Sequence, residues 1–451
     1  METLIIIIFI LGYLAIAMEH KLKIDKLVPA LAMMAILWAL IAINHLDVFE
    51  IIPGIGKESH HVEGVLLHHL GKTAEILFFL MGAMTIVEII DYFDGFSTIK
   101  SFIRTKSKVK LLWLFSSLAF VLSAIIDNLT ATIVLITILQ KIVNDKETRL
   151  WFAGLIVISA NAGGAWSPIG DVTTTMLWIA NKVTAGQLVL HVFLPSVVCY
   201  AIPTIIASRM KIFKGSIEEI LTQEKADSSS SLMFYLGLSA ILFVPIFKTI
   251  THLPPYVGMM LSLAIVAAVA EFISNRKFKL GDPDSGKQNH HFSPIHKSLS
   301  KIEMPSLLFF LGILMAVAAL ESLGMLFDFA GALERNIPFL GSEHGTTKIS
   351  DLVVLLLGVG SAIIDNVPLV AASIGMFQIP IDEPAWHFIA FAAGTGGSIL
   401  IIGSAAGVVA MGLEKIDFFW YLKNIGGLAL AGFLGGSIVF VLLRDFILNA
   451  P

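Results

Sequence analysis

Long apolar runs recur along the whole chain and are separated by short polar or basic segments. Ten of these runs approach the ~20 residues that an α-helix needs to cross a bilayer. They lie near residues 3–18, 27–46, 73–93, 150–180, 187–208, 232–250, 256–274, 305–326, 385–413 and 424–443. The pattern predicts an all-α polytopic membrane protein with about 10 spans.

Two further apolar stretches, 111–140 and 350–379, are too short for two crossings of ~20 residues and too long for one. Each has a polar break in its middle, at Asp127-Asn128 and at Asp365-Asn366. If both stretches are re-entrant hairpins, most of the 30 Lys and Arg residues fall in loops on one side of the membrane. This is the distribution that the positive-inside rule describes. We therefore expect two re-entrant hairpins, and both chain termini on the outer face.

Composition excludes several classes of protein. The chain is 56% hydrophobic and only 14% charged, whereas soluble domains are about 25% charged. Soluble enzymes and nucleic-acid-binding proteins are therefore excluded. The one cysteine, Cys199, has no intrachain disulfide partner. We expect no cleavable targeting segment, because the first apolar run carries Glu2 in place of a basic region.

An internal repeat organises the chain. The hexapeptide Ser-Ala-Ile-Ile-Asp-Asn occurs at residues 123–128 and again at 361–366. A Leu-Phe-Phe-Leu run precedes each copy, and a glycine-rich break follows each, at 160–171 and 393–404. Each half has five crossings and one hairpin, and because five is odd the two halves have opposite orientation. An inverted repeat with two broken helices that meet at the bilayer centre is typical of secondary transporters.

The repeat suggests a division into domains. We expect 1–72 and 232–304 to form scaffold spans, 73–214 and 305–451 to form the transport cores with hairpins 1 and 2, and 215–231 to be a cytoplasmic linker. Residues 276–304 are expected to be a second flexible cytoplasmic connection. The histidine-rich segment 47–72 is interpreted as a solvated loop, with an amphipathic surface helix as the alternative.

Polar residues gather at the hairpin tips and the glycine-rich breaks. Carboxylates in an apolar membrane interior are costly unless they have partners, and they are functional candidates. Oxygen ligands without Lys or Arg suit a small hard cation such as Na⁺, and a carboxylate that binds either a proton or a cation can exchange the two. The candidate cation- and proton-binding residues are Asp127, Asn128, Thr130, Asn161, Asp171, Thr173, Asp365, Asn366 and Ser404, with Na⁺ at Asp127, Asp171 and Asp365.

Other interpretations of these residues are also open. Asp127, Asp171 and Asp365 are also suitable helix N-caps. Glu88 and Glu321 follow the Leu-Phe-Phe-Leu runs, and each is either part of a proton path or a solvated side chain near a membrane face. The chain has no GxxxxGK[ST] motif for ATP and none of the GxSxG or HExxH motifs of hydrolases. A transporter without a cofactor is therefore favoured over an enzyme.

The segment 78–88, the two hexapeptides and 160–175 resemble the NhaD-type sodium/proton antiporters of the ion-transporter superfamily. The resemblance implies Na⁺/H⁺ exchange, with Li⁺ as a further cation, by an elevator-like motion in a homodimer. Plant relatives lie in the chloroplast envelope, but no Ser/Arg-rich transit segment is present here, so we expect a bacterial inner membrane. The Lys and Arg distribution then predicts periplasmic termini. The superfamily includes arsenite exporters and sodium/dicarboxylate symporters, so anion transport is the alternative. Those symporters carry Ser-Asn-Thr at the tips, where this chain has Asp127-Asn128 and Asp365-Asn366.

Overall fold

Helices make up almost all of the structure, which is a computed structural model of the chain. It describes all residues except 19–21, 53–55, 101–102, 104, 218–227, 281–292, 327, 329–348, 364–365, 378 and 449–451. The elements of the first half are α1 (Glu2–Ala17), α3 (Leu27–Ile43), β1 (Val48–Ile52), β2 (Gly56–His60), α4 (Val62–Tyr92), α5 (Ser97–Lys100), α6 (Lys108–Ile126), α7 (Asn128–Ile142), α8 (Lys146–Ala165), α9 (Val172–Ile179), α10 (Ala185–Ser208) and η1 (Lys211–Phe213).

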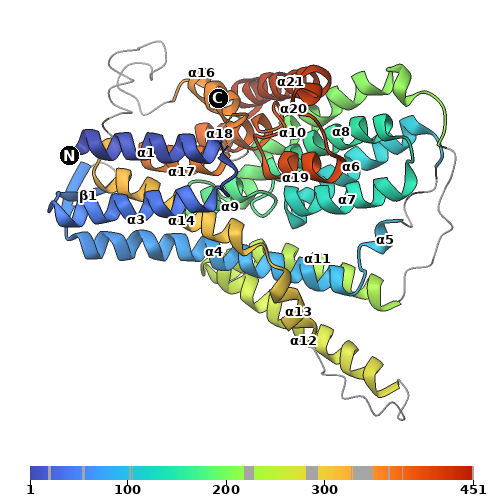
Figure 1. Ribbon diagram of the computed structural model, residues 1–451, viewed down its shortest axis with the longest axis horizontal. Helices are drawn as coiled ribbons and strands as arrows, with labels where there is room; N and C mark the ends of the chain where they lie inside the picture. The colour runs from blue at the N-terminus through green and yellow to red at the C-terminus, as the bar shows by residue number, and fades with distance from the viewer. Residues whose placement is uncertain are drawn as a thin grey trace.

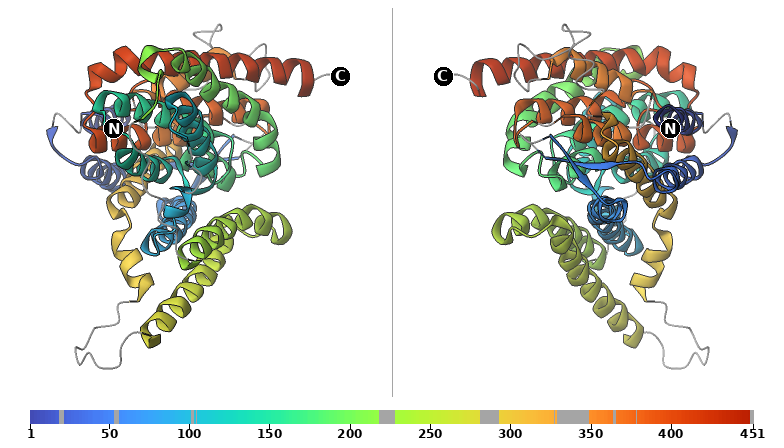
Figure 2. Two further views of the ribbon diagram at one scale, coloured as in Figure 1. Left: turned by 90° about the vertical axis from the view of Figure 1, so that its right-hand side faces the viewer. Right: turned by 90° about the vertical axis from the view of Figure 1, so that its left-hand side faces the viewer.

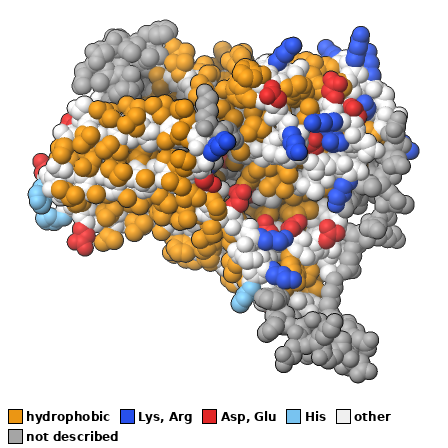
Figure 3. Space-filling view, in the orientation of Figure 1, with side chains coloured by type: hydrophobic (Ala, Val, Ile, Leu, Met, Phe, Trp, Pro, Cys, Tyr) orange, Lys and Arg blue, Asp and Glu red, His pale blue; other side chains and the backbone are white. Residues whose placement is uncertain are grey.

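The second half has a corresponding order of helices. Its elements are α11 (Ser228–Thr251), α12 (Pro255–Leu280), α13 (Pro294–Lys301), α14 (Met304–Ser322), α16 (Asp351–Ser361), α17 (Asn366–Met376), α18 (Pro384–Gly396), α19 (Ala405–Glu414), α20 (Phe418–Tyr421), η2 (Leu422–Gly426), α21 (Gly427–Leu443) and η3 (Arg444–Leu448). Within the described residues, 7 helices are long and apolar enough to cross a membrane. Hydrophobic side chains cover α1, α3 and α4 on the face seen in Figure 3, as a lipid-facing surface requires.

Both expected hairpins are present, so this part of the prediction is confirmed. Helices α6 and α7 meet at Asp127, whose backbone has φ 82° and ψ 158°. This conformation is strained for any residue other than glycine. Helices α16 and α17 form the second hairpin, and residues 364–365 at its tip lie outside the described part of the chain. In Figure 1 the two hairpins lie toward opposite ends of the long axis, as an inverted repeat requires.

The two broken helices are also confirmed. Residues 166–171 separate α8 from α9, and residues 397–404 separate α18 from α19. Each break packs against its own hairpin by the same contacts. Ser123 Oγ donates to the Ala160 carbonyl at 2.5 Å, and Ser361 Oγ donates to the Ala393 carbonyl at 2.8 Å. The repeated sequence therefore encodes a repeated packing arrangement.

The helices pack in two sets. The first set is α1, α3, α4, α11, α12, α13 and α14, and the second is α6–α10 with α16–α21. Helices α4 and α14, which the sequence grouped with the hairpins, pack against the first set. Trp38 Nε1 of α3 donates to the Met315 carbonyl of α14 at 2.9 Å, and Gly82 of α4 lies against Met259 of α12. Figure 2 shows α11 and α12 as a helix pair at the edge of the molecule.

The segment 47–72 is not the solvated loop that the sequence suggested. Strand β1 pairs antiparallel with β2, in a register that sets Val48 opposite His60. Helix α4 then begins at Val62, and Val65 is buried. The histidine pairs at 60–61 and 68–69 made this segment resemble a polar loop in the sequence.

The connection 276–304 also contains more helix than expected. Helix α12 continues to Leu280, and α13 occupies Pro294–Lys301. Lys301 Nζ lies 3.2 Å from Asp91 Oδ2 of α4. Helix α13 therefore packs against the end of α4.

The close approach of hairpin and broken helix predicts where glycine is required. A Cβ on Gly163 would lie 2.1 Å from the Phe120 carbonyl oxygen, whereas a Cβ on Gly427 would meet nothing within 4 Å. We expect Gly163→Ala to lower the melting temperature in detergent by about 5 °C or more, because overpacking costs about 1–3 kcal/mol. Gly427→Ala is the matched control and should leave it unchanged. Equal melting temperatures for both variants would contradict the packing described here.

Candidate ion-binding site

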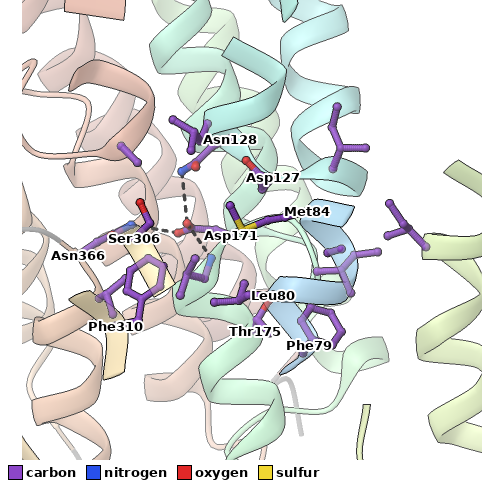
Figure 4. A pocket seen from close by; sticks show the side chains of 18 of the residues that line it. Phe79, Leu80, Met84, Asp127, Asn128, Asp171, Thr175, Ser306, Phe310 and Asn366 are labelled. Carbon is purple, nitrogen blue, oxygen red and sulfur yellow. Dashed lines mark hydrogen bonds between the residues drawn. The ribbon is translucent and has the colours of Figure 1, made fainter. Parts of the chain in front are cut away.

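A cavity lies where Asn128 of the first hairpin and Asn366 of the second meet the first break. Its polar wall comes from the starts of α7, α9 and α17, and its apolar wall comes from α4, α11, α12 and α14 (Figure 4). The cavity thus lies at the boundary between the two sets of helices. Its lining includes Lys26, Phe79, Leu80, Met84, Asp127, Asn128, Asp171, Thr175, Ser306, Phe310 and Asn366.

Asp171 is the centre of the polar wall. It is 4% exposed, and as the N-cap of α9 it accepts a hydrogen bond from the Val172 amide at 2.9 Å. The Thr173 hydroxyl also donates to the Asp171 carboxylate. Asp171 therefore caps α9, which was one of the two interpretations of this residue. Its carboxylate also accepts hydrogen bonds that capping does not require.

Those further partners come from both hairpins. Asn128 Nδ2 donates to Asp171 Oδ1 at 3.3 Å, and Asn366 Nδ2 donates to Asp171 Oδ2 at 3.0 Å. Asn128 and Asn366 are the last residues of the two repeated hexapeptides. One carboxylate is thus held by equivalent residues of the two inverted halves, and Figure 4 shows Asp171 between them.

Asp127 forms the turn of the first hairpin and lines the same cavity. Its carboxylate accepts from the Thr130 amide at 2.7 Å and from Thr130 Oγ1 at 2.9 Å, which caps α7. The side chain is half-buried at the cavity surface. The capping bonds hold the carboxylate in place at the cavity surface.

Asn161 connects the site to the second break. Its side chain is fully buried, and its Oδ1 accepts from Asn128 Nδ2 at 3.0 Å. Its Nδ2 donates to Ser398 Oγ at 2.9 Å and to Ser404 Oγ at 2.8 Å. Ser404 in turn accepts from the Gly407 amide at 3.2 Å and caps α19. Asn161 therefore connects the polar wall of the cavity, through hydrogen bonds, to the break between α18 and α19 in the second half.

The arrangement suits a cation held by carboxylates. Helices α7, α9, α17 and α19 all begin at this site, and the positive ends of their dipoles stabilise buried carboxylates. Helices α6, α8 and α18 end there, which brings carbonyl oxygens to the same place. Carboxylate, amide, hydroxyl and carbonyl oxygens are the ligands that a hard monovalent or divalent cation prefers.

Comparison with known proteins gives the family. A family model described as a citrate transporter matches residues 13–394. Sodium/proton antiporter 1 of Arabidopsis thaliana is 40% identical over 99% of this chain and 73% of its own length. The Na(+)/H(+) antiporter NhaD of Alkalimonas amylolytica is 31% identical over 93% of this chain and 86% of its own length. The chain belongs to the NhaD-type antiporter family.

The solved YdaH transporter of Alcanivorax borkumensis is similar in fold. It matches with a TM-score of 0.54 and 13% identity, and the match covers 93% of this chain and 97% of that chain. As a member of the NhaD-type antiporter family, the chain is a multi-pass membrane transporter and not an enzyme.

Eight of the expected site residues lie together, namely Asp127, Asn128, Thr130, Asn161, Asp171, Thr173, Asn366 and Ser404. Asp365 lies outside the described residues. Glu88 and Glu321 do not line the cavity. Glu88 Oε2 lies 3.8 Å from Lys301 Nζ of α13, and Glu321 of α14 lies against Gly375 of α17.

One lining residue contradicts the sequence interpretation, which assumed a site without Lys or Arg. Lys26, the N-cap of α3, lines the cavity. Its Nζ lies 4.4 Å from the centroid of the Phe309 ring. Lys26 lies far from both hairpins in the sequence, and no motif around it marks it as a residue of the site. Ser398, the second hydroxyl partner of Asn161, lies in the glycine-rich break 393–404.

The bonds at Asp171 predict how a neutral variant behaves. In Asp171→Asn, an amide NH₂ group faces the NH₂ of Asn128 or of Asn366, so a donor meets a donor. We expect this variant to melt at a lower temperature in detergent than Asp171→Ser, which keeps the cap and removes the conflict. The measurement is thermal unfolding of both purified variants beside the unmodified protein. A higher melting temperature for Asp171→Asn would show that Asn128 and Asn366 do not hold this carboxylate.

Proposed function

We propose that the protein exchanges Na⁺ for H⁺ across the membrane, and that Asp127 and Asp171 bind the two ions in competition. The observation that carries the proposal is the Asp171 carboxylate, buried at the meeting point of both hairpins and open to the cavity. The names of the NhaD relatives and of the plant antiporters support the same activity. Asp365, beside Asn366, is proposed as a third ligand. The ions are cargo, and no cofactor is part of the proposal.

A second candidate function is sodium-coupled transport of a carboxylate anion. It is favoured by the family model described as a citrate transporter and by Lys26 in the cavity. Against it, Asp127 and Asp171 would repel a dicarboxylate at short range. Exchange of a cation for a proton is therefore the stronger proposal, and the assay below separates the two.

The mechanism that we propose is an elevator-like motion. The hairpins and broken helices form the moving unit, consisting of α6–α10 and α16–α21. The scaffold consists of α1, α3, α11 and α12 together with α4 and α14. The position of the cavity between these sets supports the proposal, because sliding one set past the other moves the carboxylates relative to the apolar wall. A homodimer built on the scaffold is part of the same proposal. Glu88 and Glu321, at the ends of α4 and α14, are proposed to relay protons.

We further propose that the membrane is a bacterial inner membrane and that both termini are periplasmic. Both ends of hairpin 1 then face the cytoplasm. On a Cys199→Ala background, single cysteines at Lys106 and Asp145 should both be labelled by an impermeant maleimide only from the cytoplasmic side. Labelling of the two positions from opposite sides would contradict the topology.

Removing the titratable charge should stop exchange. In liposomes with an internal pH-sensitive dye, we expect Asp127→Asn and Asp171→Asn to reduce Na⁺-driven proton movement at least about 100-fold, because each variant loses a group that must bind both ions. The unmodified protein should respond to Na⁺ and not to citrate or succinate. Uptake of citrate or succinate coupled to Na⁺ would favour the second candidate function.

Asp145→Asn is the matched control. Asp145 caps α8 outside the membrane span, and the hydroxyl and amide of Thr148 both donate to it. These hydrogen bonds hold the pKa of Asp145 below its ordinary value, so the group stays ionised throughout the assay range. We expect this variant to exchange ions at the unmodified rate with the same pH dependence. Unmodified rates in Asp127→Asn and Asp171→Asn as well would mean that these carboxylates are caps only.

A further inference from the structure

The short helix α9 begins at Asp171, and a lysine from the other set of helices holds its far end. Lys248 lies in the last turn of α11, which belongs to the first set, whereas α9 belongs to the second. Its Nζ donates to the Trp178 carbonyl at 3.0 Å and to Asn181 Oδ1 at 3.4 Å. Both acceptors lie at the C-terminus of α9. This contact therefore crosses the boundary between the two sets.

The C-terminus of α9 is a favourable place for an ammonium group. The last carbonyls of a helix lack intrahelical partners and carry a partial negative charge, so a cation there is stabilising. Lys248 Nζ also lies 4.6 Å from the centroid of the Trp178 ring, which adds a cation–π interaction. Asn181 follows the end of α9 in a left-handed conformation with φ 52°, and its side-chain oxygen is the second acceptor. Three attractive interactions thus act on one lysine.

Trp178 contacts the first set of helices at a second point. Phe79 of α4 packs edge-on against it, with ring centroids 6.3 Å apart and an interplanar angle of 84°. Phe79 also lines the cavity, and Trp178 is only 2% exposed. Helix α9 has 8 residues. The helix that carries the central carboxylate at its start is therefore docked on the first set at its end.

The equivalent helix of the second half, α19, is held in a different way. Arg149 Nε of α8 lies 3.1 Å from Glu414 Oε2 at the end of α19. Gln140 Nε2 of α7 donates to the Leu413 carbonyl at 3.2 Å. Helices α7 and α8 belong to the same set as α19, so these contacts persist when that set moves as a unit. The Lys248 contact does not, because its two sides lie in different sets.

We propose that Lys248 is a latch between the two sets of helices, which holds α9 in the position seen here and leaves the helix end when the second set moves. This inference rests on the elevator-like motion of the proposed function. The residues that Lys248 binds, Trp178 and Asn181, are not among the proposed ion ligands. Lys248 is thus a positioning residue. Its loss should favour the other arrangement of the two sets while exchange itself persists.

Spin labels on the two sets measure the populations of the two arrangements. On a Cys199→Ala background, the labels are placed at Ile43 of α3 and Gln187 of α10, which are exposed and lie in different sets. Double electron–electron resonance should then give two distances. We expect Lys248→Met to raise the ratio of the second population to the first about tenfold, because hydrogen bonds from a charged donor are lost. Lys248→Arg should keep the unmodified ratio.

Lys108→Gln is the matched control. Lys108 Nζ donates to the Ile212 carbonyl at 3.4 Å, which is a similar contact, but both residues lie on the same side of the boundary. The ratio of populations should be unchanged in this variant. A label pair at Glu147 and Gln187, both in the second set, should give one distance in every variant. If Lys248→Met does not fold, Lys248→Gln removes the same charge.

The outcomes separate the latch from the motion on which it rests. Two distances in an unchanged ratio in the neutral variants would overturn the inference and leave the proposed motion standing. A Lys248→Arg variant that behaves like Lys248→Met would also overturn it, because the charge is then not the cause. A single distance between Ile43 and Gln187 in every variant, with and without Na⁺, would instead contradict the proposed motion.

Discussion

The structure depends on a single buried carboxylate that both inverted halves hold. Asp171 starts α9, and the side-chain amides of Asn128 and Asn366 donate to its two oxygens. A buried carboxylate without partners would cost several kcal/mol, so the hairpin tips and the first break stabilise one another only when they are assembled together. This constraint explains why irregular backbone survives at the centre of an otherwise helical membrane protein. It also leaves the charge beside a cavity, where an ion can replace part of the protein's own hydrogen bonding.

Small residues make this assembly sterically possible. The hairpins lie against the breaks so closely that a Cβ on Gly396 would come within 2.0 Å of the Gly358 carbonyl oxygen. In the first half, Gly163 and the Phe120 carbonyl make the equivalent approach. Because four helices begin at the site, their dipoles offset part of the cost of the carboxylates. The same features that fold the centre of the molecule therefore place carboxylates and helix termini beside the cavity.

Much of this arrangement was predictable from the sequence, because the repeat is explicit in it. The duplicated hexapeptide and the glycine-rich breaks predicted both hairpins and both broken helices. They also predicted that Asn128 and Asn366 lie close together. The role of Asp365 stays a prediction. Features that depend on which way a distant helix faces were not predictable. Lys26 enters the cavity from α3, and Ser398 reaches Asn161 across 237 residues. The strands β1 and β2 and the helix α13 were missed because polar and charged segments resemble loops when their packing partners are unknown.

We propose that Na⁺ and protons compete for the same carboxylates. Isothermal titration calorimetry of the purified protein with Na⁺, in two buffers of different ionisation enthalpy, counts the protons released for each Na⁺ bound. We expect proton release at neutral and acidic pH that declines to zero as the pH rises, because fully ionised carboxylates have no proton to give up. Na⁺ binding with the same heat in both buffers at every pH would contradict it, since the two ions would then occupy separate sites.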